Sequence, residues 1–539
     1  MLPSMKYADR IQKTTQIKFG GINRALSAKD GELAVTRNLT SNHAPALASR
    51  EARLLCRKLD NPGGIFSWNE LCWVEGTTFY YDGTARGQVS AGKKQFASMG
   101  AYVVIFPDKC WYNVDSGEFG SMESKWSGKS LTFGNGKLYE EDAEANAITC
   151  AGVNWADWFN PGDAVTIGGC TNRPANNKTV IIRAVDGDTL NFYENTFSIP
   201  DGETAYTENG SMTVERTVPQ IRYLCENENR LWGCTENTIY CSKLGDIFNW
   251  NVYDGLDTDS WTTDAGSAGK FTGCITFRGY PTFFKEDHIY KVYGSVPSNF
   301  EVLGSASLGL AEGSDKSLAV AGETLFYLSR NGIMAYTGGL PQPMGEAFGT
   351  GRYWDAAGGS DGLKYYVSMR DAAGGWGLYV FDTQRGTWLQ EDESQMIGFA
   401  RLRGNLYCLD ADGQIWLPGD VPEVPEDASR EAAVNWMVEF ADFTEEDPNK
   451  KGISKLQLRL ELEAGATAQV WIQYDSDGQW QPVSSALGEG TKQSYYLPVI
   501  PRRADHYRIK ITGQGGCRIY SMTRETYSGS ELRSKTGRN

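Results

Sequence analysis

From residue 65 onward, apolar and polar positions alternate in short runs that are joined by turns rich in Gly, Asn and Asp. Such alternation is typical of half-buried β-strands. A two-strand phrase recurs, made of an apolar strand, a polar turn and a second strand ending on an aromatic residue, which is the pattern of a β-hairpin. The seven copies lie at 68–83, 100–117, 228–245, 278–294, 321–339, 363–388 and 403–419.

Hairpin phrases repeated every ~30 to 55 residues are typical of propeller blades rather than helical repeats. The fold class predicted is therefore all-β, with a β-propeller of six to eight blades, and the seven phrases favour seven. In the hairpin at 228–245, the alternation places Cys234 and Cys241 among packed side chains.

Two regions interrupt the repeat. Residues 146–196 contain three short strands between Gly- and Asn-rich turns, which predicts a small β-barrel inserted at 124–216. After the Pro- and acid-rich stretch 418–431, the strands become longer and alternate cleanly, which predicts a jelly-roll-like β-sandwich at 431–527.

The other boundaries follow from composition. Residues 1–60 are irregular and polar, so we expect an extended arm there rather than a packed unit. The expected propeller occupies 61–123 and 217–420, a linker covers 421–430, and 528–539 is a disordered tail.

Charge and cysteine content narrow the function classes. A net charge of −15 disfavours tight binding of duplex nucleic acid, which needs clustered Lys and Arg. Eleven cysteines without C-x-x-C pairs predict reduced, mostly buried thiols in a protein made inside the cell. The first residues carry no apolar signal segment, and the apolar runs are too short to span a bilayer, so we expect no membrane insertion.

Catalytic patterns are weak. "GGSDG" at 358–362 matches a nucleophile elbow, but the residues that follow predict a strand instead of the required helix. His43, His288 and His506 are the only histidines. Glycosidases need two carboxylates around the bond, whereas the acids here lie mostly in turns, and 474–480 lacks the sialidase Asp-box spacing.

Ion-binding patterns are incomplete. Asp residues two apart at 254–264 and 410–416 could hold calcium, but neither has a full loop pattern, and Asp in turns usually caps its own backbone. Cys234 and Cys241 lack the second pair that zinc requires. We expect no metal, no cofactor and no catalytic residue. The basic stretch 501–510 with Arg518 is either a solvated strand face or a contact for an acidic partner.

Most of the chain, apart from 146–196, resembles bacteriophage virion proteins of the packaged-DNA stabilisation or tail-nozzle family. The resemblance lies in "GGINRALSAKDGELAVTRNLT" with "PALASREARL", in "NRLWGCTENTIYCSKLGDIFNWNVYDG", in "GCITFRGYPTFFKEDHIYKVYG" and in the strands from "ISKLQLRLELE" to "CRIYSM". No catalytic residues define that family, so the resemblance implies a structural protein that is not an enzyme.

The resemblance also implies an assembly. Family members form a β-propeller ring of several copies, typically six, around the DNA exit channel, below the portal and adaptor. They retain the packaged genome until ejection. We therefore expect a homo-oligomeric ring, a hexamer, in the phage tail of the virion, made in the host bacterial cytoplasm. Its expected partners are the portal or adaptor and tail fibre or tail-tip proteins, and DNA passes through without sequence-specific binding.

Two alternatives stay open: a tail-tip module that binds a receptor or carbohydrate through its sandwich, and a propeller glycosidase. In the assembly interpretation, the loops 245–261 and 295–304 are expected to meet neighbouring subunits or the channel. Aromatic residues anchor such interfaces. The candidate interface residues are Phe248, Trp250, Tyr253, Trp261 and Phe300.

Overall fold

The computed structural model describes residues 10–25, 28–137, 144–421, 424–425, 427–446 and 449–528. These residues form β-strands and a few 3₁₀ turns, which confirms the all-β prediction. The chain divides into two compact units, residues 61–315 on the one hand and 1–60 with 316–539 on the other. No helix in the described ranges is long and apolar enough to cross a bilayer. The 3₁₀ turns are η1 (Trp155–Asp157), η2 (Pro174–Asn176), η3 (Pro297–Asn299), η4 (Asp315–Ser317) and η5 (Gly345–Phe348).

The unit of residues 61–315 contains four sheets of four antiparallel strands, each paired in sequence order. Tight turns connect the strands; at the turn after β25, Arg278 and Gly279 both have positive φ (52° and 78°), as a type I′ turn requires. The first two sheets are β6 (Pro62–Trp68), β7 (Glu70–Glu75), β8 (Thr78–Tyr81), β9 (Thr84–Gln88), and β10 (Gln95–Met99), β11 (Tyr102–Phe106), β12 (Cys110–Asn113), β13 (Phe119–Ser121). The other two are β21 (Tyr223–Asn227), β22 (Arg230–Cys234), β23 (Thr238–Cys241), β24 (Trp261–Asp264), and β25 (Gly273–Phe277), β26 (Tyr280–Phe284), β27 (His288–Tyr293), β28 (Glu301–Ala306).

Between the second and third of these sheets, the chain forms one seven-stranded sheet in the order β17-β16-β20-β14-β15-β19-β18. Its core contains Trp126, Trp155 and Phe133, all nearly fully buried. The strand path has β17 and β18 at its two ends, so closure into a barrel stays a prediction. The strands are β14 (Ser124–Lys137), β15 (Glu144–Thr149), β16 (Ala164–Gly168), β17 (Thr179–Ile181), β18 (Ala184–Asp186), β19 (Thr189–Tyr193) and β20 (Ala205–Arg216).

The second unit contains three more antiparallel sheets, two of four strands in sequence order and a third of five strands. The third is completed by β5 from the N-terminal segment, which pairs with β39, and β40 pairs with the other edge of β5. The strands are β29 (Ala319–Ala321), β30 (Thr324–Ser329), β31 (Gly332–Tyr336), β32 (Gln342–Pro343); β33 (Tyr353–Ser360), β34 (Lys364–Asp371), β35 (Trp376–Asp382), β36 (Thr387–Asp392); and β37 (Met396–Leu402), β38 (Asn405–Asp410), β39 (Gln414–Leu417), β5 (Leu54–Lys58), β40 (Ser429–Arg430).

Two further sheets enclose the largest apolar cluster among the described residues, contributed by alternating inward positions of strands such as β42. One has the order β3-β4-β48-β42-β45, with β1 on β48 and β46 on β42, and the other β2-β41-β47-β43-β44. The first comprises β1 (Arg10–Gln16), β3 (Leu39–Thr40), β4 (Leu47–Ser49), β42 (Lys451–Leu462), β45 (Gly490–Pro498), β46 (Arg503–Ala504) and β48 (Cys517–Ser528). The second comprises β2 (Leu33–Arg37), β41 (Asn435–Phe440), β43 (Thr467–Tyr474), β44 (Gln481–Pro482) and β47 (Tyr507–Gln514).

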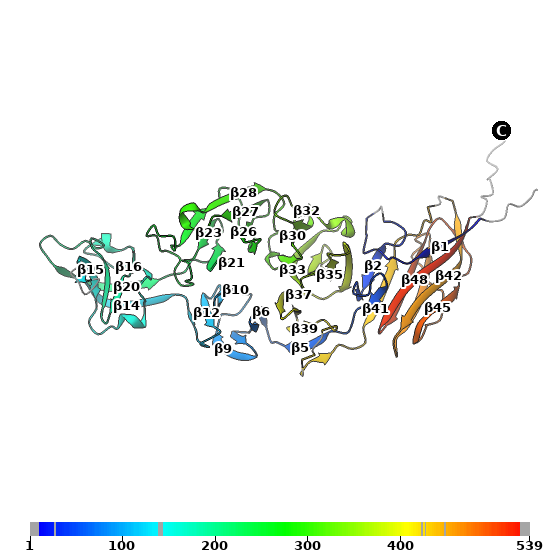
Figure 1. Cartoon of the computed structure of the whole chain (residues 1–539), viewed down its shortest axis with the longest axis horizontal. Helices are drawn as coiled ribbons and strands as arrows, with labels where there is room; N and C mark the ends of the chain where they lie inside the picture. The colour runs from blue at the N-terminus through cyan, green and yellow to red at the C-terminus, as the bar shows by residue number, and fades with distance from the viewer. Residues whose placement is uncertain are drawn as a thin grey trace, which may run out of the picture. The chain divides into compact units, whose positions relative to one another are not determined.

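The expectation of an extended arm at 1–60 is wrong for the residues that the structure describes. Strand β1 pairs with β48, β2 pairs with β41, and β5 pairs with β39 in a five-stranded sheet. In Figure 1 the blue strands β1 and β2 lie among the orange and red strands of the sandwich. The partners lie hundreds of residues away, so local sequence pattern could not show this packing. Residues 1–9 and 529–539, including most of the expected tail, lie outside the described residues.

Candidate functional site

The loop between β23 and β24 is braced from beneath by Arg230, whose side chain is buried. The Arg230 guanidinium donates to the carbonyl oxygens of Ser242 (2.9 Å), Asp259 (2.6 Å) and Asp257 (2.7 Å). A buried cation that bonds three carbonyls of one loop fixes its backbone, because each bond to a charged donor contributes more than a neutral one.

Asp259 holds the outer turn of the same loop. Its Oδ2 accepts the backbone N–H groups of Asp254 (2.5 Å), Gly255 (2.8 Å) and Leu256 (3.1 Å). The acid-rich stretch considered for calcium thus uses this carboxylate as a backbone cap. Across the described residues, no group of three or more His, Cys, Asp or Glu side chains is placed to hold a metal ion.

Asn249 ties the loop to the inserted sheet. Its Nδ2 donates to Asp163 Oδ1 (2.9 Å) and its Oδ1 accepts the backbone N–H of Ala164 (2.9 Å). Asp163 is itself paired with Arg216, at 2.5 Å. The loop and the insert are therefore joined by a buried polar network, and all its residues lie in the unit of residues 61–315.

Four of the five predicted interface residues pack within the chain. Trp250 is only 1% exposed and lies in a core cluster, with Phe248 packed against that cluster. Trp261 and Phe300 pack edge-on to each other, with ring centroids 5.6 Å apart. Tyr253 differs, being 54% exposed. The interface assignment itself stays a prediction, and Tyr253 is the member whose side chain is available at the surface.

The same loop exposes two aliphatic residues that sequence reasoning missed. Leu244 and Leu256 are 42% and 56% exposed. The interface prediction considers aromatic residues only. The turns "KLGD" and "GLD" each place a leucine between turn-forming residues, and this pattern could have indicated an exposed apolar side chain. Leu244, Tyr253, Leu256 and the exposed Asp257 are called the loop patch below.

A groove of about 380 Å³ runs beside the loop patch, between the loop and the insert. The Arg183 guanidinium stacks on the Tyr193 ring (4.0 Å to the centroid) and pairs with Asp254 (2.5 Å). Tyr193 is 53% exposed, so it adds apolar area next to Tyr253.

A second site lies in the other unit, where the N-terminal segment meets the sheet that β5 completes. Arg53 pairs with Glu391 and Asp392, both at 2.6 Å, and Arg50 forms a bidentate pair with Glu431 (2.7 and 3.0 Å). Both arginines are about one-tenth exposed or less. These pairs connect segments from three distant parts of the sequence.

The charges of this network are strongly coupled. Burial alone would raise the pKa of Asp392, but Arg53 and bonds from Ser394 outweigh it and hold that pKa below its usual value. For Glu431, burial likewise acts upward on the pKa, and the bonds from Arg50 lower it overall. Burial acts to lower the pKa of Arg53, and the two carboxylates raise it above the ordinary value. All these groups are therefore charged around neutral pH.

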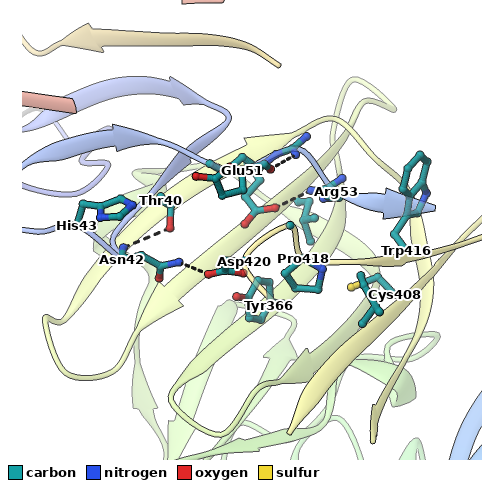
Figure 2. Close-up of a pocket in the computed structure, with 15 residues that line it drawn as sticks. Thr40, Asn42, His43, Glu51, Arg53, Tyr366, Cys408, Trp416, Pro418 and Asp420 are labelled. Carbon is teal, nitrogen blue, oxygen red and sulfur yellow. Dashed lines mark hydrogen bonds and ion pairs between the residues drawn. The ribbon is translucent and has the colours of Figure 1, made fainter. Parts of the chain in front are cut away.

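Next to this network lies a pocket of about 180 Å³ (Figure 2). Its wall includes the rings of Trp416 and Tyr366 and the polar groups of Asn42, His43 and Asp420. Asn42 Nδ2 donates to Asp420 Oδ2 at 2.6 Å. Cys408 also lines it, but burial raises the pKa of that thiol to about 12, so it is a poor nucleophile.

The remaining sequence candidates have structural partners. Ser360 ends β33, and its hydroxyl accepts the N–H of Gly362 (2.9 Å) in a turn that leads into another strand, unlike a nucleophile elbow. Cys234 and Cys241 are fully buried in an apolar cluster. In the basic stretch, Arg508 pairs with Glu439 and Asp442, which favours the interpretation as a strand face with local pairing.

No family model and no curated protein matches the chain. Among solved structures, the chain is similar to BamB from Moraxella catarrhalis (11% identity, 70% of this chain and 99% of that one, TM-score 0.35). It is also similar to a Trypanosoma rangeli sialidase mutant displaying trans-sialidase activity (9%, 88% and 95%, 0.25). A third is an exo-β-1,3-galactanase from Phanerochaete chrysosporium (10%, 56% and 94%, 0.22).

These comparisons correct one expectation. The chain was expected not to be an enzyme, but the similar solved structures are mostly glycoside hydrolases and sialidase, so that expectation is withdrawn. The likeness is to all-β proteins of the β-propeller kind. At these TM-scores it assigns no reaction or ligand to this chain.

Proposed function

We propose that the chain is a structural protein of a bacteriophage tail, which assembles as a ring of copies around the DNA exit channel. In this role it retains the packaged genome and connects the portal or adaptor to distal tail parts. The sequence resemblance described above supports the proposal. The structural observation that carries it is the loop patch, an exposed apolar surface on a loop that is fixed from within.

A fixed loop suits binding because little conformational entropy is lost when a partner docks. Arg230 and Asp259 hold the backbone, so that Leu244, Tyr253 and Leu256 are presented without support from a partner. Exposed apolar side chains that are gathered on one loop mark an interaction surface more often than scattered ones do.

The net charge supports the channel role. At −15, the chain disfavours a lasting grip on phosphate backbones, as a channel that must release DNA requires. The exposed carboxylate of Asp257 on the loop patch is negatively charged, like the chain as a whole.

We further infer that the six four-stranded sheets and the five-stranded sheet that contains β5 are the seven blades of one propeller, with the insert as a small barrel. The strand β5 supports this inference. A blade that combines an N-terminal strand with β37, β38 and β39 joins the beginning of the repeat to its end, as closure of a propeller requires. A low-resolution image that shows six or eight blades would contradict the count.

The assembly is tested with the full chain by native mass spectrometry and electron microscopy. We expect a ring, a hexamer, with a hole wide enough for DNA, and we expect monomers from the double variant Tyr253→Glu/Leu256→Glu. Leu340→Glu is the matched control, because Leu340 is also exposed (69%) and lies in a different sheet region. A wild-type chain that stays monomeric at high concentration overturns the proposal.

The pocket in Figure 2 favours a second candidate, a carbohydrate site. Aromatic rings beside amide and carboxylate groups can stack on a sugar and bond its hydroxyls. Titration with bacterial surface polysaccharide tests this: Trp416→Ala should abolish binding, and release of reducing ends would show hydrolysis. If the polysaccharide binds neither the wild type nor Trp416→Ala, the carbohydrate site is excluded.

A further inference from the structure

The outer face of the large sandwich sheet carries an unusual residue. In the pairing of β42 with β45, Leu456 and Leu458 face the core, opposite Leu497 and Tyr495. The alternate positions therefore point outward, and they bring Tyr496 opposite Gln457. Tyr496 is 75% exposed, and Ile500 just beyond the strand is 85% exposed. These are the two most exposed large apolar residues among those described.

The same face carries positive charge. Arg459 lies on β42 opposite Ser494, next to Tyr496 on the outward side, and is exposed. Lys492 lies over the Tyr520 ring, 3.7 Å from its centroid. Neither cation has a carboxylate partner among the described residues. Arg459, Lys492, Tyr496 and Ile500 are called the sheet patch.

The loop patch is also apolar, but the charge beside its apolar residues is negative. It combines the exposed Tyr253 and Leu256 with Asp257, whose carbonyl accepts from Arg230 while its side chain is exposed. Within the described ranges, no partner of the Asp257 carboxylate is found. Each patch is thus an apolar centre with unpaired charge beside it, positive on one and negative on the other.

We propose that the sheet patch of one copy binds the loop patch of the next copy, an inference that rests on the proposed function. Opposite charges across an interface favour the correct partner and speed its association. Contacts between two sheet patches or between two loop patches would oppose like charges, which disfavours an assembly in which either patch meets its own copy. A contact between two different surfaces is heterologous, and heterologous contacts close into rings when the rotation permits.

Charge reversal tests the pairing in the full chain. Arg459→Glu and Asp257→Lys should each weaken self-association at least tenfold in sedimentation velocity, and the chain with both changes should recover the wild-type assembly. Arg352→Glu, an exposed charge reversal outside both patches, is the control and should leave the assembly intact. Thermal unfolding of each variant should match the wild type, since all three positions are exposed.

A cross-link tests the contact directly. Tyr496→Cys and Leu256→Cys chains, mixed with oxidised glutathione as the thiol oxidant, should form a disulfide-linked dimer that neither variant forms alone. If wild-type rings form but both reversals leave them intact and no mixed dimer appears, the docking is overturned while the proposed function stands. If the wild type never forms a ring, the proposed function itself fails.

Discussion

Arg524 and Glu445 form an ion pair in the interior of the C-terminal sandwich, with Nε 2.8 Å from Oε1 and side chains only 2% and 4% exposed. The hydroxyl of Tyr507 donates to the same carboxylate, and the Phe443 ring lies 4.0 Å from the guanidinium. Burial, followed by the Glu445 charge, raises the pKa of Tyr507 well above its usual value, so the phenol stays a donor.

Breaking this pair should be costly. Glu445→Gln leaves the Arg524 charge buried without a counter-charge, and loss of one partner of a buried pair typically costs about 3–5 kcal/mol. Denaturant unfolding should show this loss, and the double variant Arg524→Met/Glu445→Gln should recover much of it. A single variant within about 1 kcal/mol of the wild type would contradict the prediction.

The Arg50 and Arg53 network should make the unit sensitive to acid. Asp392 and Glu431 have folded pKa values below their ordinary 3.8 and 4.5, so the unfolded chain takes up protons first as the pH falls. The stability that they contribute is present above those ordinary values and is lost as the pH drops through the folded values.

Melting temperatures measured from pH 7 to about pH 3 check this, because the slope below about pH 4.5 reports proton uptake. In Arg53→Met, burial is left to act on Asp392 without its main counter-charge, so the loss of stability should begin at higher pH. An unchanged pH profile in that variant would contradict the prediction.

Two aromatic residues of the loop should differ in their contribution to the free energy of unfolding. Trp250→Ala removes a side chain that is 1% exposed, and we expect a loss of about 3–5 kcal/mol in the free energy of unfolding. Tyr253→Ala, three residues away and 54% exposed, should change it by less than about 0.5 kcal/mol. Urea unfolding compares the two, and equal losses would show that the loop packs differently.

The thiols should react in two classes. Cys234 and Cys241 are fully buried, and burial raises the pKa of Cys241 to about 12. Cys56 and Cys110 are half-buried, and burial raises their pKa values to about 11. A chromogenic disulfide reagent should label partly buried thiols, such as Cys56 and Cys110, slowly in the native protein and all eleven cysteines after unfolding. Rapid native labelling of Cys241 would contradict the burial.

Each of the seven hairpins predicted from the sequence corresponds to two neighbouring inner strands of one sheet. The phrase at 278–294, for example, covers β26 and β27, both mostly buried. Outer strands such as β9 and β28 were missed, because they are exposed at nearly every position and carry little apolar alternation. Their strand conformation is set by pairing with the neighbouring strand rather than by their own residues.

The candidate site shows the same division. The sequence indicated a loop after β23 that a simple hairpin does not need, and Tyr253 was recognised within it. It could not show that Trp250 packs inward, because the direction depends on how Arg230 and Asn249 hold the loop. The sheet patch was missed altogether, since Tyr496 and Arg459 are adjacent only through strand pairing.

The sequence by itself determined that this protein is built from β-hairpins, because alternation and turn chemistry are local properties of the chain. The tertiary structure decided where the N-terminal strands go. Strand β1 pairs with β48, more than 500 residues later in the chain, and Arg53 next to β5 pairs with Glu391 and Asp392. Pairing between distant strands depends on edges and charges that only the folded units bring together, so no local pattern could predict it.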